Sequence, residues 1–400
     1  MPPRALYLVV LLLTSCEPAE QGRFEAPDGG GCSVGETYCS QSLACVDLES
    51  SAEHCGLCDR SCAEGWNCRA GRCSPPGAAT VAIDGDVAQY LDVIVDTRGI
   101  AHTCFSVGNG LGDVDLLYGR LEPSDDGRWH TEAITRRDWA GAYCAIAVFE
   151  GTVRVAYYID TNDELGWATR TRDGHWTTQS PSLGGRFNSV HVESSGVTHV
   201  SHYDYTIEDL LYHRFAADGE TLERTETVDA DGDVGSWSSL SLDPAGRPVI
   251  AYLDGTQGSV QLARRGEDGW EHTLVEARTA DHIHLAADAR GALYLAYRLT
   301  TGELRYGTGT FDALVMRTLE SGVTAVGLTL GIDDDPVLCF GTTTGVHCSG
   351  ELGPDGRAVE VSDVVTSAIA VSIGPSNKQH VVFRDDGRGA LMHAVSPVTQ

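Results

Sequence analysis

One short phrase recurs seven times along residues 78–400. Each copy has an alternating strand, a turn residue and a second strand, with a small or modest-sized residue five places after the turn and a ring six places after it. The copy Gly246-Arg-Pro-Val-Ile-Ala-Tyr252 is the clearest. The turn residues stand 43 to 52 residues apart, at Gly99, Gly151, Gly196, Gly246, Gly291, Asp334 and Asn377. A period of this length indicates a repeat architecture in which each unit buries its apolar face against its neighbours.

Each repeat continues with a third strand and, after a Gly-containing turn, a fourth, as at Leu211-Tyr212 and Trp270-Glu271. Four short antiparallel strands in about 45 residues are typical of a propeller blade. Stacked β-sandwiches, the competing architecture, need about 100 residues per unit. We therefore expect an all-β fold, a seven-bladed β-propeller preceded by a small disulfide-rich module.

The two ends of the repeat region are expected to pair. The last repeat stops after its third strand, near residues 390–394, and residues 79–83 form a lone strand before the first repeat. Adding that strand to the last blade closes the ring and removes the exposed edges that promote aggregation.

Residues 32–73 form a cysteine-rich segment that is too short to fold on an apolar core alone. Its even number of cysteines predicts a disulfide module with unknown connectivity. Cys55 and Cys58, with Cys62 nearby, could instead hold zinc. The cysteines of this segment are Cys32, Cys39, Cys45, Cys55, Cys58, Cys62, Cys68 and Cys73.

The first residues have the layout of a secretory signal, with one cation at Arg4 followed by an apolar run. Leu13-Thr14-Ser15-Cys16 resembles a bacterial lipobox. The resemblance implies that residues 1–15 are removed and that the Cys16 thiol is lipidated, whereas an ordinary signal peptide with a chance cysteine is the alternative. Glu17 then favours an outer-membrane or cell-surface location, with the membrane contacted only through the lipid. Residues 16–31 are polar, with Gly and Pro, and indicate a flexible tether.

Two further resemblances cover most of the remaining chain. The spacing from Cys45 to Cys73 resembles modules of secreted myxobacterial proteins and of plant stigma-specific proteins, which implies a spacer or adhesive role. The phrase over residues 241–252 resembles the repetitive secreted propellers of environmental bacteria. The turn Asp126-Gly-Arg-Trp129 resembles a shortened Asp-box of sialidase-type propellers, and we interpret it as a structural turn.

The composition is strongly acidic, with 28 Lys and Arg against 57 Asp and Glu and a formal net charge of -29. Nucleic-acid binding needs clustered cations, so this charge argues against that class of partner. Such a surface suits cations, basic partners or simple solubility.

The loops between strands 4 and 1 and between strands 2 and 3 emerge on one face of a propeller, which is the expected ligand face. Rings recur there just before strand 1 and could stack on sugars, although packing between blades is the alternative. The predicted ligand-face residues are Tyr90, Trp139, Phe187, Trp237, His282, Asp160, Asp204, Asp254 and Asp385. Acidic loops could hold Ca²⁺ or could simply form turns. The candidate Ca²⁺ residues are Asp84, Asp86, Asp229, Asp231 and Asp233.

Four cysteines lie within the repeats. Cys339 and Cys348 fall on neighbouring strands and could form a cross-strand disulfide, and Cys104 and Cys144 could bridge adjacent blades. Buried free thiols are the alternative for all four.

The sequence contains no linear catalytic motif of the common hydrolase or phosphate-binding kinds. We expect a monomeric, surface-displayed, non-enzymatic recognition protein for a glycan or a protein, with no firmly implied cofactor. A propeller hydrolase or lyase acting on polysaccharide, whose carboxylates would come from separate blades, and a purely structural spacer are the alternatives.

Overall fold

The computed structural model describes residues 32–33, 35–40, 42–51, 53–58, 61, 67–69, 72–74, 80–83, 85–108, 114–125, 127–135, 139–349, 358–375 and 377–397. Cys16, Cys62 and Asp84 lie outside the described residues, as do the expected signal peptide and tether. The chain divides into two compact units, residues 1–74 and 75–400. None of the described residues forms a helix of the length and hydrophobicity needed to cross a membrane.

The first unit consists of short hairpins joined by disulfides. β1 (Thr37–Cys39) pairs with β2 (Ala44–Val46), and β3 (Asn67–Arg69) pairs with β4 (Arg72–Ser74). Its described disulfides join Cys32 to Cys45, Cys39 to Cys58 and Cys55 to Cys68. The disulfide-rich module is thus confirmed. Since zinc needs free thiolates, these bonds exclude the zinc alternative at Cys55 and Cys58.

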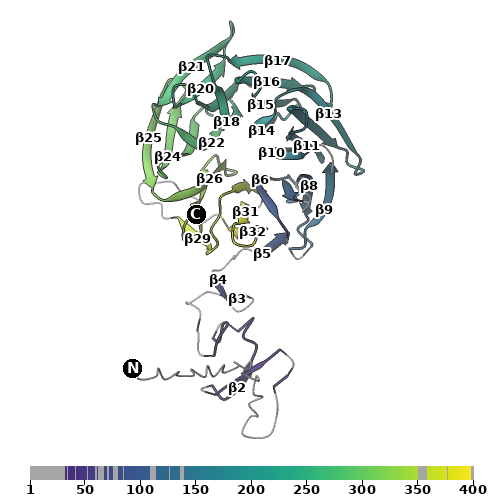
Figure 1. The fold of residues 1–400 in the computed structure, drawn as a ribbon, viewed down its shortest axis with the longest axis vertical. Helices are drawn as coiled ribbons and strands as arrows, with labels where there is room; N and C mark the ends of the chain where they lie inside the picture. Colours follow the sequence, from purple (N-terminus) through teal and green to yellow (C-terminus); the bar gives the residue numbers. More distant parts are fainter. Residues whose placement is uncertain are drawn as a thin grey trace, which may run out of the picture. The chain divides into compact units, whose positions relative to one another are not determined.

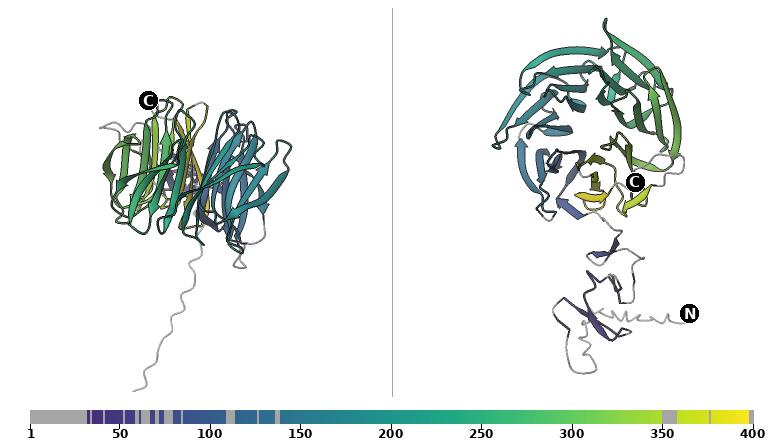
Figure 2. Two further views of the ribbon diagram at one scale, coloured as in Figure 1. Left: turned by 90° about the horizontal axis from the view of Figure 1, so that it is seen from above. Right: turned by 180° about the vertical axis from the view of Figure 1, so that it is seen from behind.

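The second unit is the predicted seven-bladed propeller (Figure 1). Each blade is a four-stranded antiparallel sheet, and its first strand contacts the first strands of the neighbouring blades around the central channel. Seen from the side, the blades stand next to one another as upright sheets (Figure 2). The first four blades contain β6 (Val87–Val95), β7 (Ala101–Gly108), β8 (Val114–Leu121) and β9 (His130–Thr135); β10 (Ala140–Phe149), β11 (Thr152–Ile159), β12 (Glu164–Arg170) and β13 (Trp176–Leu183); β14 (Arg186–Val192), β15 (Thr198–Asp204), β16 (Asp209–Phe215) and β17 (Leu222–Asp229); and β18 (Val234–Leu242), β19 (Pro248–Asp254), β20 (Ser259–Arg265) and β21 (Trp270–Glu276).

The seventh blade combines both ends of the propeller chain, as expected. β5 pairs antiparallel with β32, with Val81 opposite Met392 and Ile83 opposite Leu391. The last three blades contain β22 (Ala280–Ala287), β23 (Leu293–Leu299), β24 (Leu304–Thr310) and β25 (Ala313–Glu320); β26 (Val323–Leu330), β27 (Pro336–Thr342), β28 (Val346–Ser349) and β29 (Val359–Ser362); and β30 (Ile369–Ile373), β31 (Lys378–Asp385), β32 (Ala390–Pro397) and β5 (Thr80–Ile83).

The repeated turn residue has a conformational cause. All seven positions adopt a left-handed backbone, with φ between +53° and +89°. Glycine reaches this region without steric cost, and Asp and Asn are the side chains that tolerate it best. The two turns without glycine accordingly carry Asp334 (φ +63°) and Asn377 (φ +53°).

Apolar side chains of adjacent blades form the core, and two disulfides add to it. Cys339 and Cys348 pair across β27 and β28 within one blade. Cys104 on β7 and Cys144 on β10 join the first blade to the second. The free-thiol alternative for these four cysteines is therefore wrong.

Candidate functional site

One residue near the start of each innermost strand occupies an equivalent place around the channel. In five successive blades this residue has a ring, and in the last two it is alanine. The seven residues are Tyr90, Tyr143, Phe187, Trp237, His282, Ala325 and Ala368. We call the five rings the aromatic arc. All five side chains are half-buried, so each retains some accessible surface.

Each ring of the aromatic arc packs against the next one in a tilted arrangement. Successive centroids, from Tyr90 to His282, are 4.2, 4.5, 4.9 and 4.7 Å apart. The angles between successive ring planes are 46°, 54°, 43° and 30°. Equivalent side chains repeated around a seven-fold axis would differ by about 51°. The arc therefore follows the symmetry of the propeller and ends where Ala325 and Ala368 replace the rings.

The backbone holds these rings in an unusual conformation. Four arc residues, Tyr143, Phe187, Trp237 and His282, have φ between +48° and +57° at a β-bulge. A left-handed backbone costs a residue with a side chain roughly 1–2 kcal/mol. Such strain persists only where the surroundings over-determine it, and it is concentrated at functional sites.

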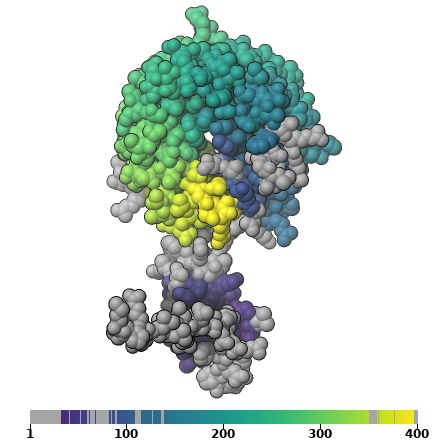
Figure 3. Space-filling view, viewed as in Figure 1, coloured from purple at the N-terminus to yellow at the C-terminus, as the bar shows by residue number. Residues whose placement is uncertain are grey.

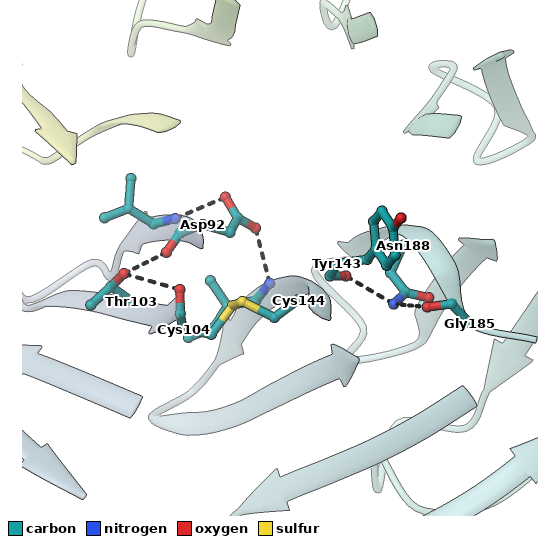
Figure 4. The surroundings of a disulfide bond; sticks show 9 residues. Asp92, Thr103, Cys104, Tyr143, Cys144, Gly185 and Asn188 are labelled. Carbon is teal, nitrogen blue, oxygen red and sulfur yellow. Dashed lines mark hydrogen bonds between the residues drawn. A yellow bond between two sulfur atoms is a disulfide. The ribbon is translucent and has the colours of Figure 1, made fainter. Parts of the chain in front are cut away.

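Neighbouring blades fix two of these strained residues through their carbonyl groups. The amide Nδ2 of Asn188 donates to the carbonyl oxygen of Tyr143 at 2.9 Å and to that of Gly185 at 2.6 Å (Figure 4). One blade further on, the Ser238 hydroxyl donates to the carbonyl oxygen of Phe187 at 2.8 Å. The same device thus recurs at two successive blade boundaries.

A second layer of side chains lies two residues further along the innermost strands. Here Asp92, Ser189 and Ser239 each accept a hydrogen bond from a backbone N–H of the next blade at 2.9 Å. Because the innermost strand has no partner on its channel side, its N–H groups need such acceptors. Asp92 accepts from Ile146 with Oδ2 and from Val93 with Oδ1, at 2.9 and 2.8 Å (Figure 4). Burial raises the pKa of Asp92 to about 6.

The two layers enclose a cavity of about 360 Å³ in the channel. Its opening is visible near the centre of the ring of blades in Figure 3. All five rings of the aromatic arc line it, together with Asp92, Asn188, Ser189, Ser239 and His284. Burial lowers the pKa of His282 and of His284 to about 4, so both imidazoles are neutral at pH 7.

The structure brings together four of the five predicted rings, Tyr90, Phe187, Trp237 and His282, in this cavity. Trp139 lies elsewhere: its side chain is 51% exposed and is not among those that line the cavity. Tyr143 takes the equivalent place in the second blade, and sequence reasoning missed it.

The predicted ligand-face aspartates lie at the turns between the second and third strands. Asp204 accepts from the backbone N of Thr206, and Asp254 from that of Gln257, at 2.9 and 2.7 Å. The remaining two are Asp385, which accepts from its own turn, and the exposed Asp160. Three of these four carboxylates therefore cap their own turns.

The acidic loops hydrogen-bond mainly to tyrosines. Asp229 accepts from the Tyr252 hydroxyl at 2.6 Å, and Asp233 accepts from the Tyr203 hydroxyl at 2.8 Å. Asp86 and Asp231 are exposed. Within the described ranges, no group of three or more His, Cys, Asp or Glu side chains is arranged to hold a metal ion.

No protein-family model matches the sequence, and no curated protein matches it. Several solved structures resemble the fold at low sequence identity. AofleA from Arthrobotrys oligospora is 12% identical, with a TM-score of 0.49, over 71% of this chain and 91% of that one. The polysaccharide lyase Uly1 is 10% identical, with a TM-score of 0.49, over 80% and 91%. The SapL1 lectin, solved with alpha methyl fucoside, is 10% identical, with a TM-score of 0.49, over 69% and 97%. These values are too low to transfer a function.

Proposed function

We propose that the propeller is a carbohydrate-recognition module whose binding site is the channel cavity. The aromatic arc is the observation that carries this proposal. Sugar rings present C–H faces that pack on aromatic surfaces, and hydroxyl groups that need polar partners. Beside the arc, the cavity provides hydroxyl, amide and carboxylate groups from Ser189, Ser239, Asn188 and Asp92. Its volume of about 360 Å³ lies within the usual range of small-molecule sites.

A glycan array probed with the full chain tests this proposal, alongside incubation with a panel of polysaccharides. We expect binding without new reducing ends or unsaturated products. Trp237→Ala, in the middle of the arc, should abolish binding. Leu274→Ala, at a 58% exposed side chain on the outer strand β21, should leave binding unchanged.

Three results would count against the proposal. A silent array would refute carbohydrate recognition, and released products would show that the propeller is an enzyme. Binding that survives Trp237→Ala but is lost on Trp139→Ala would move the site from the channel to the exposed loop.

We also propose that the chain is exported and anchored through a lipid on Cys16. The disulfides of the structure support an oxidising compartment, because reducing cytosol disfavours such bonds. Metabolic labelling with a radioactive fatty acid tests the anchor. The label should appear on the wild-type chain and be absent from Cys16→Ser, and equal labelling of both would refute the proposal.

A further inference from the structure

The carboxylate of Asp92 is the charged group in the lining of the cavity. The other side chains that line it are apolar, hydroxyl, amide or imidazole groups, and both imidazoles are neutral. The Asp92 carboxylate accepts hydrogen bonds from two backbone N–H groups, those of Val93 and Ile146. N–H donors satisfy hydrogen bonding without supplying a positive charge. The described cavity therefore holds a negative charge that no side chain of its lining neutralises.

A second acceptor lies in the cavity lining, two blades away from Asp92 on β14. Because the Nδ2 of Asn188 donates to two carbonyl oxygens, its Oδ1 is turned away from them. This Oδ1 is buried and has no hydrogen-bond partner among the described atoms. Buried acceptors are nearly always paired, so an orphan in a cavity wall needs an explanation. It adds partial negative charge to the lining of the cavity.

The net charge of the whole chain also favours a cationic ligand. Its formal net charge of -29 attracts cations and raises their concentration near the surface. A metal ion would need several oxygen ligands, whereas this lining offers one carboxylate. An organic cation needs only one carboxylate partner and can use the arc for its apolar surface.

We propose that the cavity selects glycans with free amino groups, whose ammonium group pairs with the Asp92 carboxylate while the sugar ring packs against the aromatic arc. This inference rests on the proposed carbohydrate recognition and adds the class of sugar. The arc ends at Tyr90, two residues before Asp92 on the same strand, and the next blade contributes Ala368 to the lining. The side of Tyr90 towards Ala368 is thus not covered by another arc ring, and the Asp92 carboxylate lies on the side of the second blade, where Ile146 donates to it.

The equivalent residues of other blades indicate which substitution of Asp92 tests this inference. Ser189 and Ser239 occupy the place of Asp92 in other blades and accept the same bond between blades at the same 2.9 Å. Asp92→Ser should therefore remove the charge and keep the bond to Ile146. Ser241→Ala is the matched control, because it removes a similar bond between blades, from the backbone N–H of Ala287, at a residue outside the cavity lining, and leaves the charge in place. Circular dichroism and thermal melting verify that both variants fold.

The probes are a glucosamine hexamer and its fully N-acetylated counterpart, titrated calorimetrically into the full chain at pH 7.5 and low salt. We expect the free amine to bind about tenfold tighter or more, as a hydrogen bond to a charged group implies. Asp92→Ser should lose this preference, and Ser241→Ala should keep it.

Equal affinity for the two probes, tighter binding of the acetylated one, or a preference that persists in Asp92→Ser would each overturn the inference while carbohydrate recognition stands. Failure of both hexamers to bind would also overturn it. In that case a positive or silent glycan array shows whether the proposed function survives.

Discussion

Asp92 gives a quantitative prediction because its charge is buried without a cation. The perturbation is Asp92→Ser, and the quantity is the free energy of unfolding as a function of pH. The pKa of this carboxyl is raised from 3.8 to about 6 in the folded chain. Between these values the folded state holds a proton that the unfolded state has released, so stability falls as pH rises through this window. The destabilisation caused by the buried charge of Asp92 is absent below about pH 4 and complete above about pH 6.

The size of the effect follows from the shift. About two pH units at 1.36 kcal/mol each give about 3 kcal/mol, and partial exposure to water in the channel reduces this to about 2 kcal/mol. The stability of Asp92→Ser relative to wild type should therefore be about 2 kcal/mol more favourable at pH 7.5 than at pH 3.5.

Urea unfolding followed by tryptophan fluorescence at pH 3.5, 5.0 and 7.5 measures this difference. Ser239→Ala is the control, because it removes a bond between blades from a group that does not titrate, and its effect should be the same at every pH. A relative stability of Asp92→Ser that does not change with pH, or that becomes less favourable as pH rises, would refute the reasoning.

Three further predictions concern the arc, the disulfide between blades and the acidic loops. Because Trp237 has φ +57°, Trp237→Gly should be more stable than Trp237→Ala by about 1 kcal/mol in urea unfolding, the reverse of the usual order. Cys104 and Cys144 are 40 residues apart, so replacing both with Ala should lower the free energy of unfolding by about 4 kcal/mol, and an unchanged midpoint would contradict this. EDTA should leave the melting temperature unchanged, because tyrosine hydroxyls already pair with Asp229 and Asp233, and a clear decrease would instead show that a cation stabilises the native chain.

The fold was predictable because every repeat needs the same kind of residue at its turn. A left-handed turn needs Gly, Asp or Asn, and that need marks all seven hairpins in the sequence. The lone strand at residues 80–83 was predictable for a different reason, since a missing fourth strand at one end matches a spare strand at the other.

Tyr143 escaped prediction because the first hairpin of the second blade is shorter than the equivalent hairpin of the first blade. Its β10–β11 hairpin turns on Glu150 and Gly151, both left-handed, and is one residue shorter than the corresponding hairpin of the first blade. Counting back from the turn therefore does not reach the ring. It reaches Ala142, one position before Tyr143.

The role of Asp92 could not be read from the sequence either. Its place in the repeat is held by serine in two other blades, and nothing in the sequence reports that its partners are N–H groups rather than cations. Charge compensation depends on which groups a distant strand presents, and the donor from the next blade, Ile146, lies 54 residues away.

The composition of the seventh blade has a consequence for vectorial synthesis. β5 leaves the ribosome or an export channel before any blade exists, whereas its partner β32 is the last strand to follow. Six blades can form while the nascent chain lengthens, but the ring stays open until Met392 and its neighbours are free. Throughout that interval two strand edges are available to the wrong partner. The final step of maturation is therefore a long-range closure, and a chain that stalls near its end would be the species most prone to associate with other copies.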